Sequence, residues 1–132
     1  MKHTKKFAAI FCSVLLISMV ASFTVFADSK PVDLNQNQYT NYSFWTNTIS
    51  HQSKFSGVNS SSSNHYVYFT AQYYDAVAKQ GFDDNYYYAP NNGINFRTQY
   101  TTKRTGVYQW RLKLNPTGPF AGCTASGTIT TI

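Results

Sequence analysis

Few side chains of this sequence are of the kinds that carry out covalent chemistry. Cys123 could act as a nucleophile if His51 or His65 lay beside it as a base. No base adjoins Cys123 in the sequence, and its neighbours predict a strand rather than a helix N-terminus, which would activate a thiol. We therefore expect Cys123 to be buried and unreactive; the alternative is a disulfide to another chain.

The carboxylates offer a second route to chemistry. A glycosidase needs two carboxyl groups, which here would come from Asp75, Asp83 and Asp84. The same side chains, with Asn85, could supply oxygen ligands to Ca²⁺. Adjacent aspartates followed by asparagine are, however, typical of a turn, and the regular spacing of a calcium loop is missing. The sequence thus predicts no catalytic residue, no metal site and no cofactor, and we expect a protein that is not an enzyme.

Tyrosines are the most suggestive candidates for a binding site. Three of them are consecutive, namely Tyr86, Tyr87 and Tyr88. In a strand the middle residue faces away from its two neighbours, so at least one of the three points away from the core. The same question arises for the preceding strand, with Tyr66, Tyr68, Tyr73 and Tyr74. Exposed tyrosines are enriched in binding surfaces, although tyrosine is also a common strand residue without any ligand.

Basic residues are the second candidate. Alternating apolar and polar residues at 94–101 and 108–114 predict two strands, and residues 102–106 predict the loop of a β-hairpin between them. The outward face and the tip of this hairpin would carry Arg97, Lys103, Arg104, Arg111 and Lys113. Such a face could bind an anionic polymer or a membrane surface. It could equally serve only to keep an exposed sheet soluble.

The N-terminus predicts export. A segment with three lysines precedes an apolar run over residues 7–26, and Val25 and Ala27 stand at the −3 and −1 positions of a cleavage site. We expect a signal peptide at residues 1–27 and a secreted, extracellular product. An uncleaved membrane anchor is the alternative, because about 20 apolar residues can span a bilayer.

Charge and composition limit the partners. Lys2, Lys5 and Lys6 belong to the predicted signal peptide, so residues 28–132 carry 8 basic and 5 acidic side chains, a formal charge of +3. This charge is too small for a dedicated nucleic-acid-binding protein. We expect no nucleic-acid partner, and membrane contact only during export. A single cysteine after the leader favours a bacterial, Gram-positive origin.

Strand patterns organise the remainder of the chain. Residues 28–41 are polar and predict a loose N-terminal arm or a peripheral strand. Residues 42–132 contain six or seven strand patterns separated by turn residues, with almost no helix. This arrangement predicts a single all-β domain, an antiparallel β-sandwich.

Two functional hypotheses follow. The first is a secreted, non-catalytic binding protein that holds a cell-surface polymer, a glycan or another protein through exposed tyrosines and the basic sheet face. The second is a small secreted cationic antibacterial or toxin-like effector, because positive charge favours anionic bacterial surfaces.

Overall fold

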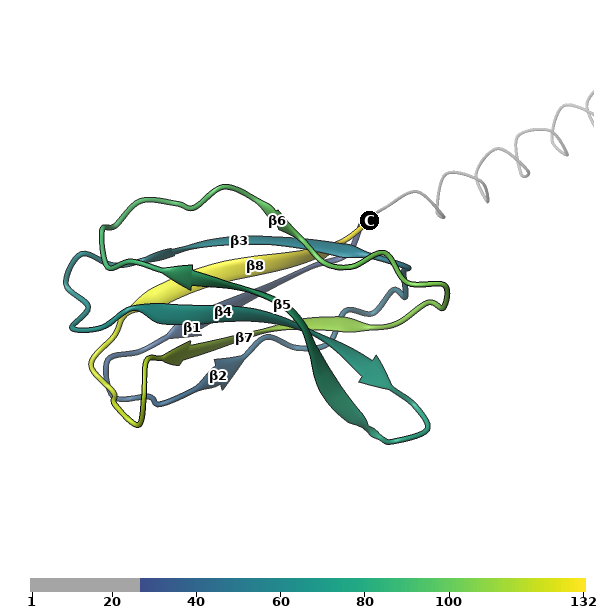
Figure 1. The fold of residues 1–132 in the computed structure, drawn as a ribbon, viewed down its shortest axis with the longest axis horizontal. Coiled ribbons are helices and arrows are strands. Elements are labelled where there is room, and N and C mark those ends of the chain that lie inside the picture. The colour runs from purple at the N-terminus through teal and green to yellow at the C-terminus, as the bar shows by residue number, and fades with distance from the viewer. Residues whose placement is uncertain (1–26) are drawn as a thin grey trace, which may run out of the picture.

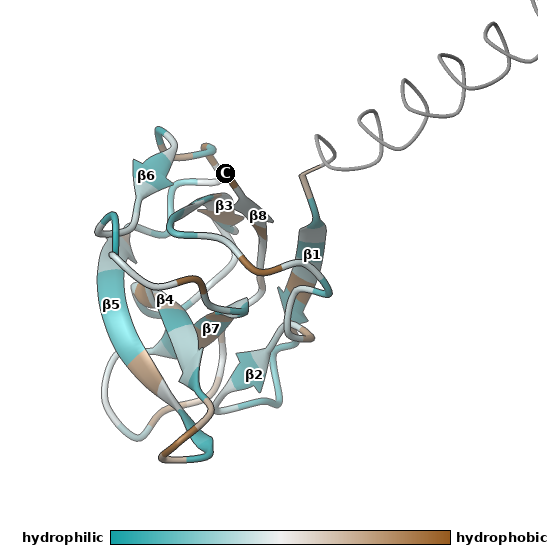
Figure 2. Ribbon diagram, turned by 90° about the vertical axis from the view of Figure 1, so that its right-hand side faces the viewer, coloured by the Kyte–Doolittle hydropathy of each residue, from teal (hydrophilic) through white to brown (hydrophobic). Residues whose placement is uncertain are grey.

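The fold consists of two antiparallel sheets packed face to face (Figures 1 and 2). This computed structural model describes residues 27–132. Its strands are β1 (Ser29–Leu34), β2 (Asn41–Tyr42), β3 (Ser53–Asn59), β4 (Val67–Asp75), β5 (Gln80–Ala89), β6 (Gln99–Tyr100), β7 (Trp110–Pro116) and β8 (Ala125–Thr131). The first sheet has the order β1-β8-β3-β6 and the second the order β2-β7-β4-β5. The predicted all-β sandwich is confirmed.

The sandwich has eight strands rather than six or seven, and two of them, β2 and β6, have only two residues each. The predicted signal peptide, residues 1–27, lies outside the described residues apart from Ala27. Among residues 27–132 there is no helix long and apolar enough to cross a membrane.

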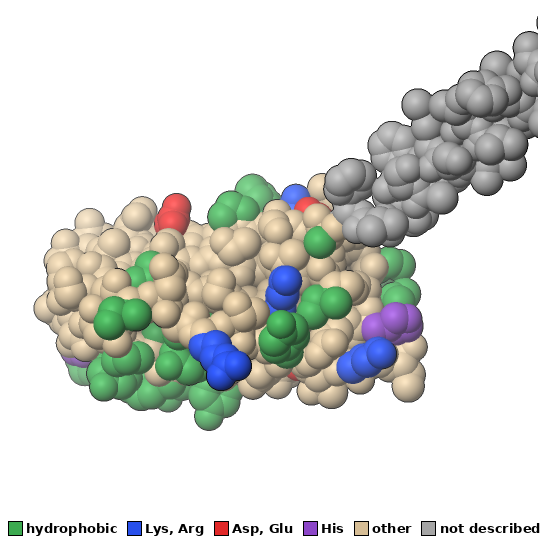
Figure 3. Space-filling model, turned by 90° about the horizontal axis from the view of Figure 1, so that it is seen from above, with side chains coloured by type: hydrophobic (Ala, Val, Ile, Leu, Met, Phe, Trp, Pro, Cys, Tyr) green, Lys and Arg blue, Asp and Glu red, His purple; other side chains and the backbone are tan. Residues whose placement is uncertain are grey.

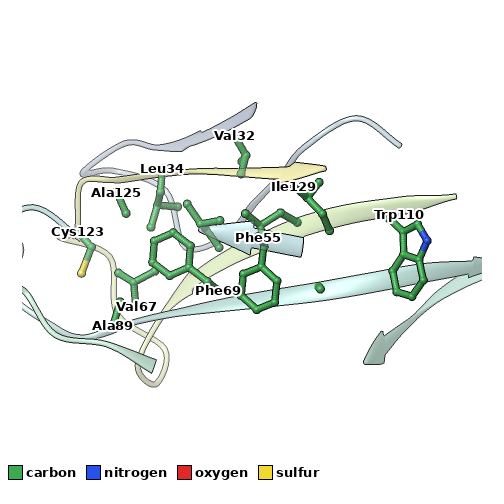
Figure 4. Close-up of a cluster of buried hydrophobic side chains, with 13 residues drawn as sticks. Val32, Leu34, Phe55, Val67, Phe69, Ala89, Trp110, Cys123, Ala125 and Ile129 are labelled. Atoms are coloured by element: carbon green, nitrogen blue, oxygen red, sulfur yellow. The ribbon is translucent and has the colours of Figure 1, made fainter. Parts of the chain in front are cut away.

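The core lies between the sheets and follows from period-two alternation. Strands β3, β7 and β8 alternate strictly between buried and more exposed residues, as expected for strands covered on one face. Figure 4 shows the buried side chains converging on the space between the layers. They are Val32, Leu34, Phe55, Val67, Phe69, Ala71, Ala89, Trp110, Leu112, Leu114, Cys123, Ala125 and Ile129.

Two paired glycines let the sheets approach closely. Gly57 of β3 lies opposite Gly127 of β8, on the inner side of the first sheet. A Cβ atom on Gly127 would lie 2.9 Å from Leu112 Cδ2 and 3.0 Å from Phe69 Cε1. A Cβ atom on Gly57 would overlap the Phe69 ring as well. The missing side chains therefore make room for the large residues of the second sheet.

The predicted β-hairpin over residues 94–114 is wrong. β6 pairs with β3, whereas β7 pairs with β2 and β4, so the two arms belong to different sheets. The first arm runs along β3: the Phe96 N–H donates to the Gly57 carbonyl and the Thr101 N–H to the Ser53 carbonyl, both at 3.0 Å. The loop that follows crosses between the layers. Alternation indicates which side chains share a face of a strand, but it identifies neither the neighbouring strand nor whether that face is buried.

Of the two forms predicted for residues 28–41, the structure contains the peripheral strand. β1 pairs with β8 along its whole length at the edge of the first sheet. Val32 and Leu34 of β1 are buried in the core. The sandwich therefore begins at Ser29 rather than at residue 42, because two apolar residues at alternate positions suffice to hold this polar strand.

β4 and β5 form a long hairpin, which projects from the sandwich in Figure 1. Asp75 shapes its turn by accepting hydrogen bonds from the N–H groups of Val77 (2.8 Å) and Ala78 (3.0 Å). The turn predicted at residues 82–85 is wrong, since these residues lie inside β5. The pairing shifts there, leaving Asp84 without a partner in β4, as in a β-bulge.

Candidate binding face

The outer face of the second sheet carries a group of four tyrosines on or next to two neighbouring strands, β4 and β5. Tyr68 of β4 lies opposite Tyr88 of β5, and Tyr86 is in the next row of the same face. Tyr66 directly precedes β4, and its ring contacts that of Tyr88. Tyr66, Tyr68, Tyr86 and Tyr88 together form the tyrosine face. Two of the three consecutive tyrosines of the sequence thus point outward.

The rings of the tyrosine face support one another. The Tyr88 ring centroid lies 4.8 Å from that of Tyr66 and 4.5 Å from that of Tyr68. Tyr68 also meets Tyr86, at 5.7 Å and edge-on. The Tyr88 hydroxyl lies 2.7 Å from the Thr117 hydroxyl, a hydrogen bond that fixes its outer end. The face is nevertheless accessible, with Tyr86 61%, Tyr66 42% and Tyr88 39% exposed.

β7 borders the tyrosine face with polar side chains. Asn115 lies opposite Tyr68, and Lys113 lies opposite Thr70, whose other neighbour is Tyr86. Lys113 is half-buried and forms no salt bridge within the described residues. A lysine in such a position offers its positive charge to a ligand that rests on the tyrosines.

Arg111, one row further along β7, is already engaged. Its guanidinium carbon lies 4.2 Å from the ring centre of Tyr42 and 4.3 Å from that of Trp45, which gives two cation–π contacts. Its Nε donates to Gln72 Oε1 at 2.8 Å, and Gln72 Nε2 donates to Asp83 Oδ1 at 2.6 Å. Partial burial lowers the pKa of Arg111 below its ordinary value, and the opposing electrostatic effects of Tyr42 and Asp83 are too small to cancel this shift. Arg111 therefore braces the sheet rather than presenting a free charge.

Tyr87 does not belong to the outer face. Its ring stacks on Phe96, with centroids 4.3 Å apart and planes at 23°. Tyr87 packs against the core cluster, as the alternation along β5 requires. The prediction grouped it with Tyr86 and Tyr88, but the structure separates it from them.

The predicted basic face is not formed, because its members lie on different parts of the fold. Arg97 is exposed on the segment between β5 and β6, which runs alongside β3, whereas Arg111 and Lys113 belong to β7 of the other sheet. Lys103 is exposed in the loop between β6 and β7. Figure 3, seen from the side of β6, shows the Lys and Arg side chains apart from one another, while hydrophobic side chains gather along one edge.

Arg104, the other predicted loop cation, is a structural residue. Its Nη2 and Nε lie 2.6 and 3.1 Å from the same oxygen of Asp84, whose side chain is only 1% exposed. The other oxygen of Asp84 accepts from the Thr102 N–H at 2.7 Å. The guanidinium carbon also lies 3.7 Å from the ring centre of Tyr73. The β-bulge directs Asp84 into this contact.

The residues considered for catalysis have structural contacts. Cys123 is buried, as predicted, and its thiol donates to the His65 carbonyl at 3.3 Å. The His65 ring stacks on Phe120. His51 Nδ1 lies within hydrogen-bond distance of the carbonyls of Arg104 (3.1 Å) and Gly106 (3.0 Å). Residues 27–132 contain no group of three or more His, Cys or Asp side chains that could hold a metal.

The sequence did not predict the two aromatic residues that cover Arg111 on the outer side of the second sheet, Tyr42 and Trp45. Trp45 lies in the loop after β2, and its ring covers the guanidinium of Arg111. Its ring centroid is 5.4 Å from that of Tyr74, in an edge-on contact. Gly81 gives it room, because a Cβ there would lie 2.9 Å from the indole. The only sequence signal for this contact is a glycine within a strand, which often marks close approach by another group.

Comparison with protein-family models and with curated proteins gives no match for this chain. Among solved structures, the chain is similar to the crystal structure of the mitogen derived from Yersinia pseudotuberculosis. The two share 7% sequence identity with a TM-score of 0.44, and the match covers 81% of this chain and 86% of that chain.

Proposed function

We propose that this chain is a secreted, non-catalytic binding protein whose binding surface is the tyrosine face. Its ligand is a cell-surface polymer, a glycan or a protein. The observation that carries the proposal is the gathering of Tyr66, Tyr86 and Tyr88 on one side of a sheet with 39–61% of each side chain exposed. Tyrosine provides a large, amphipathic contact area and has only two side-chain torsions to restrict on binding.

The restricted conformations of these side chains also support the proposal. Immobilising a flexible side chain on binding costs about 0.5–1.5 kcal/mol. The contacts among the rings and the bond from Tyr88 to Thr117 meet part of this cost before a ligand arrives. A face that is both exposed and ordered is suited to recognition.

Basic side chains contribute less to the proposed binding surface than the sequence predicted. Lys113 is the basic side chain that borders the tyrosines without a salt-bridge partner among residues 27–132. Arg104 and Arg111 are occupied by Asp84 and by aromatic rings. The second hypothesis, a cationic effector, lacks comparable support because the predicted basic side chains are divided between the two sheets and the loop between β6 and β7.

Retention on isolated bacterial cell walls and on a glycan and protein array tests the proposal. The full chain is expressed with export, and the product is collected from the medium. We expect Tyr66→Ala/Tyr86→Ala to weaken binding about tenfold or more. The matched control is Tyr39→Ala/Tyr100→Ala, which removes two tyrosines that are 63% and 56% exposed elsewhere. Equal retention of both double variants and the wild type contradicts the proposal.

Export is tested in the same preparation. N-terminal sequencing of the product in the medium should begin at Asp28. A chain that stays in the membrane fraction with its N-terminal segment intact contradicts secretion and supports the anchor.

A further inference from the structure

We infer, on the basis of the function proposed above, that the ligand of the tyrosine face is a protein surface in which aliphatic side chains adjoin a carboxylate, and not a glycan. The inference concerns the geometry of the rings and the charge beside them. Both distinguish among the three ligand classes that the proposed function leaves open.

The rings of the tyrosine face are inclined to one another. The Tyr88 plane is inclined by 48° to Tyr66 and by 30° to Tyr68, and Tyr68 meets Tyr86 at 66°. A sugar ring binds an aromatic side chain by lying flat on an open ring face. Neighbouring rings with such different inclinations form no common platform for consecutive sugars. Rings at such angles present edges as well as faces, and aliphatic side chains of a protein can pack against both.

The charge distribution at the tyrosine face indicates that the ligand carries a carboxylate. The edge of an aromatic ring carries partial positive charge, so inclined rings present an edge that attracts an anion. Lys113 adds a full positive charge in the same row as Tyr86, with Thr70 between them, and forms no salt bridge within the part of the chain that the structure describes. The carboxylate on this side of the sheet, Asp83, is held by Gln72. Charge complementarity therefore favours an acidic partner.

The layout also matches the anatomy of protein interfaces. Such interfaces have an aromatic centre, rich in tyrosine, within a polar rim. Here the tyrosines form the centre, and Lys113, Asn115 and Thr117 lie at its border. A neutral polysaccharide would make no use of the lysine charge.

Two probes separate the alternatives. A phage-displayed library of random peptides is panned on the exported protein, and three soluble polysaccharides are tested by affinity electrophoresis: xylan, mixed-linkage β-glucan and polygalacturonate. We expect selected peptides to combine Leu, Ile or Val with Asp or Glu. Their affinity should fall about tenfold or more with Tyr66→Ala/Tyr86→Ala and several-fold with Lys113→Gln. Lys54→Gln, on an exposed lysine of the other sheet, is the matched charge control and should change nothing.

The outcomes distinguish this inference from the proposed function. Binding of a polysaccharide that the double tyrosine substitution abolishes would overturn the protein ligand and leave the tyrosine face as a binding surface. Peptide binding that the double substitution does not weaken would overturn both. Selection of peptides without acidic residues, or an unchanged peptide affinity of the Lys113→Gln variant, would overturn the inference that the ligand contains a carboxylate. Thermal unfolding of each variant shows whether it retains the wild-type fold.

Discussion

The ring of Tyr87 stacks on that of Phe96, and this contact divides three consecutive tyrosines between the two sides of one sheet. Phe96 in turn meets Phe55 and Phe69 of the core edge-on, at 6.3 and 4.9 Å. Tyr87 therefore joins the segment that runs beside β3 to the core, while its two neighbours remain outside.

Substitution of Tyr87 is predicted to affect stability. Tyr87→Ala should lower the free energy of unfolding by about 3 kcal/mol, because it removes a large aromatic side chain from the core margin. Tyr86→Ala should cost less than about 1 kcal/mol, because its side chain is mostly exposed. Urea unfolding followed by circular dichroism measures both values. Equal losses would contradict the assignment of the two side chains to opposite faces.

The contact between Arg104 and Asp84 is predicted to be coupled energetically. Asp84→Ala should cost about 3 kcal/mol, because the guanidinium then keeps its partly buried position without a partner. The double variant with Arg104→Ala should cost at least about 1 kcal/mol less than the sum of the single substitutions. A double-mutant cycle in urea tests this, and additive losses would show that the pair is not coupled.

Gly127 is predicted to be intolerant of any side chain. Gly127→Ala should destabilise the fold by about 2 kcal/mol, because its Cβ would press against Phe69 and Leu112. Ser126→Ala, at the next position and half-buried, is the control and should change stability by less than about 0.5 kcal/mol. Thermal unfolding compares the two. A Gly127→Ala protein as stable as wild type would refute the close approach of the sheets.

Asn59 is predicted to require an amide. It is buried, and its Nδ2 donates to the carbonyls of His65 (2.9 Å) and Ala89 (3.1 Å). Asn59→Ala should cost about 2 kcal/mol by leaving these carbonyls without their donor. Asn59→Asp should cost more at neutral pH, because a carboxylate faces two carbonyl oxygens. Unfolding in guanidinium chloride ranks the variants, and an aspartate variant as stable as the alanine variant would contradict the donor role.

Local patterns predicted the class of fold but not the neighbours of each strand. The alternation predicted at residues 108–114 is found over residues 110–114, which the structure places in β7 (Trp110–Pro116). Residues 94–100 alternate too, yet Ile94 and Tyr100 are 67% and 56% exposed. Their segment is held by backbone hydrogen bonds to β3, and the partners of Phe96 and Thr101, namely Gly57 and Ser53, lie 39 and 48 positions earlier in the chain. Backbone pairing of this kind leaves no trace in side-chain type.

The candidate site was predictable to the same limited degree. Alternation requires Tyr86 and Tyr88 to share one face, but it cannot say whether that face is the core. Arg97 and Arg111 were grouped because both are polar positions of one expected hairpin, and that hairpin does not exist. Trp45 covers Arg111 from a loop, and a contact between residues so far apart cannot be read from composition.

The central claim is that the tyrosine face is the surface that binds, and chemical protection tests it without any substitution. Tyrosines are iodinated in the exported protein, free and bound to isolated cell walls, and the modified peptides are quantified by mass spectrometry. We predict slower modification of Tyr66, Tyr86 and Tyr88 in the bound state, with Tyr39 and Tyr100 unchanged. Unchanged modification of Tyr86 with protection at Tyr39 or Tyr100 would place the binding surface elsewhere and contradict the claim.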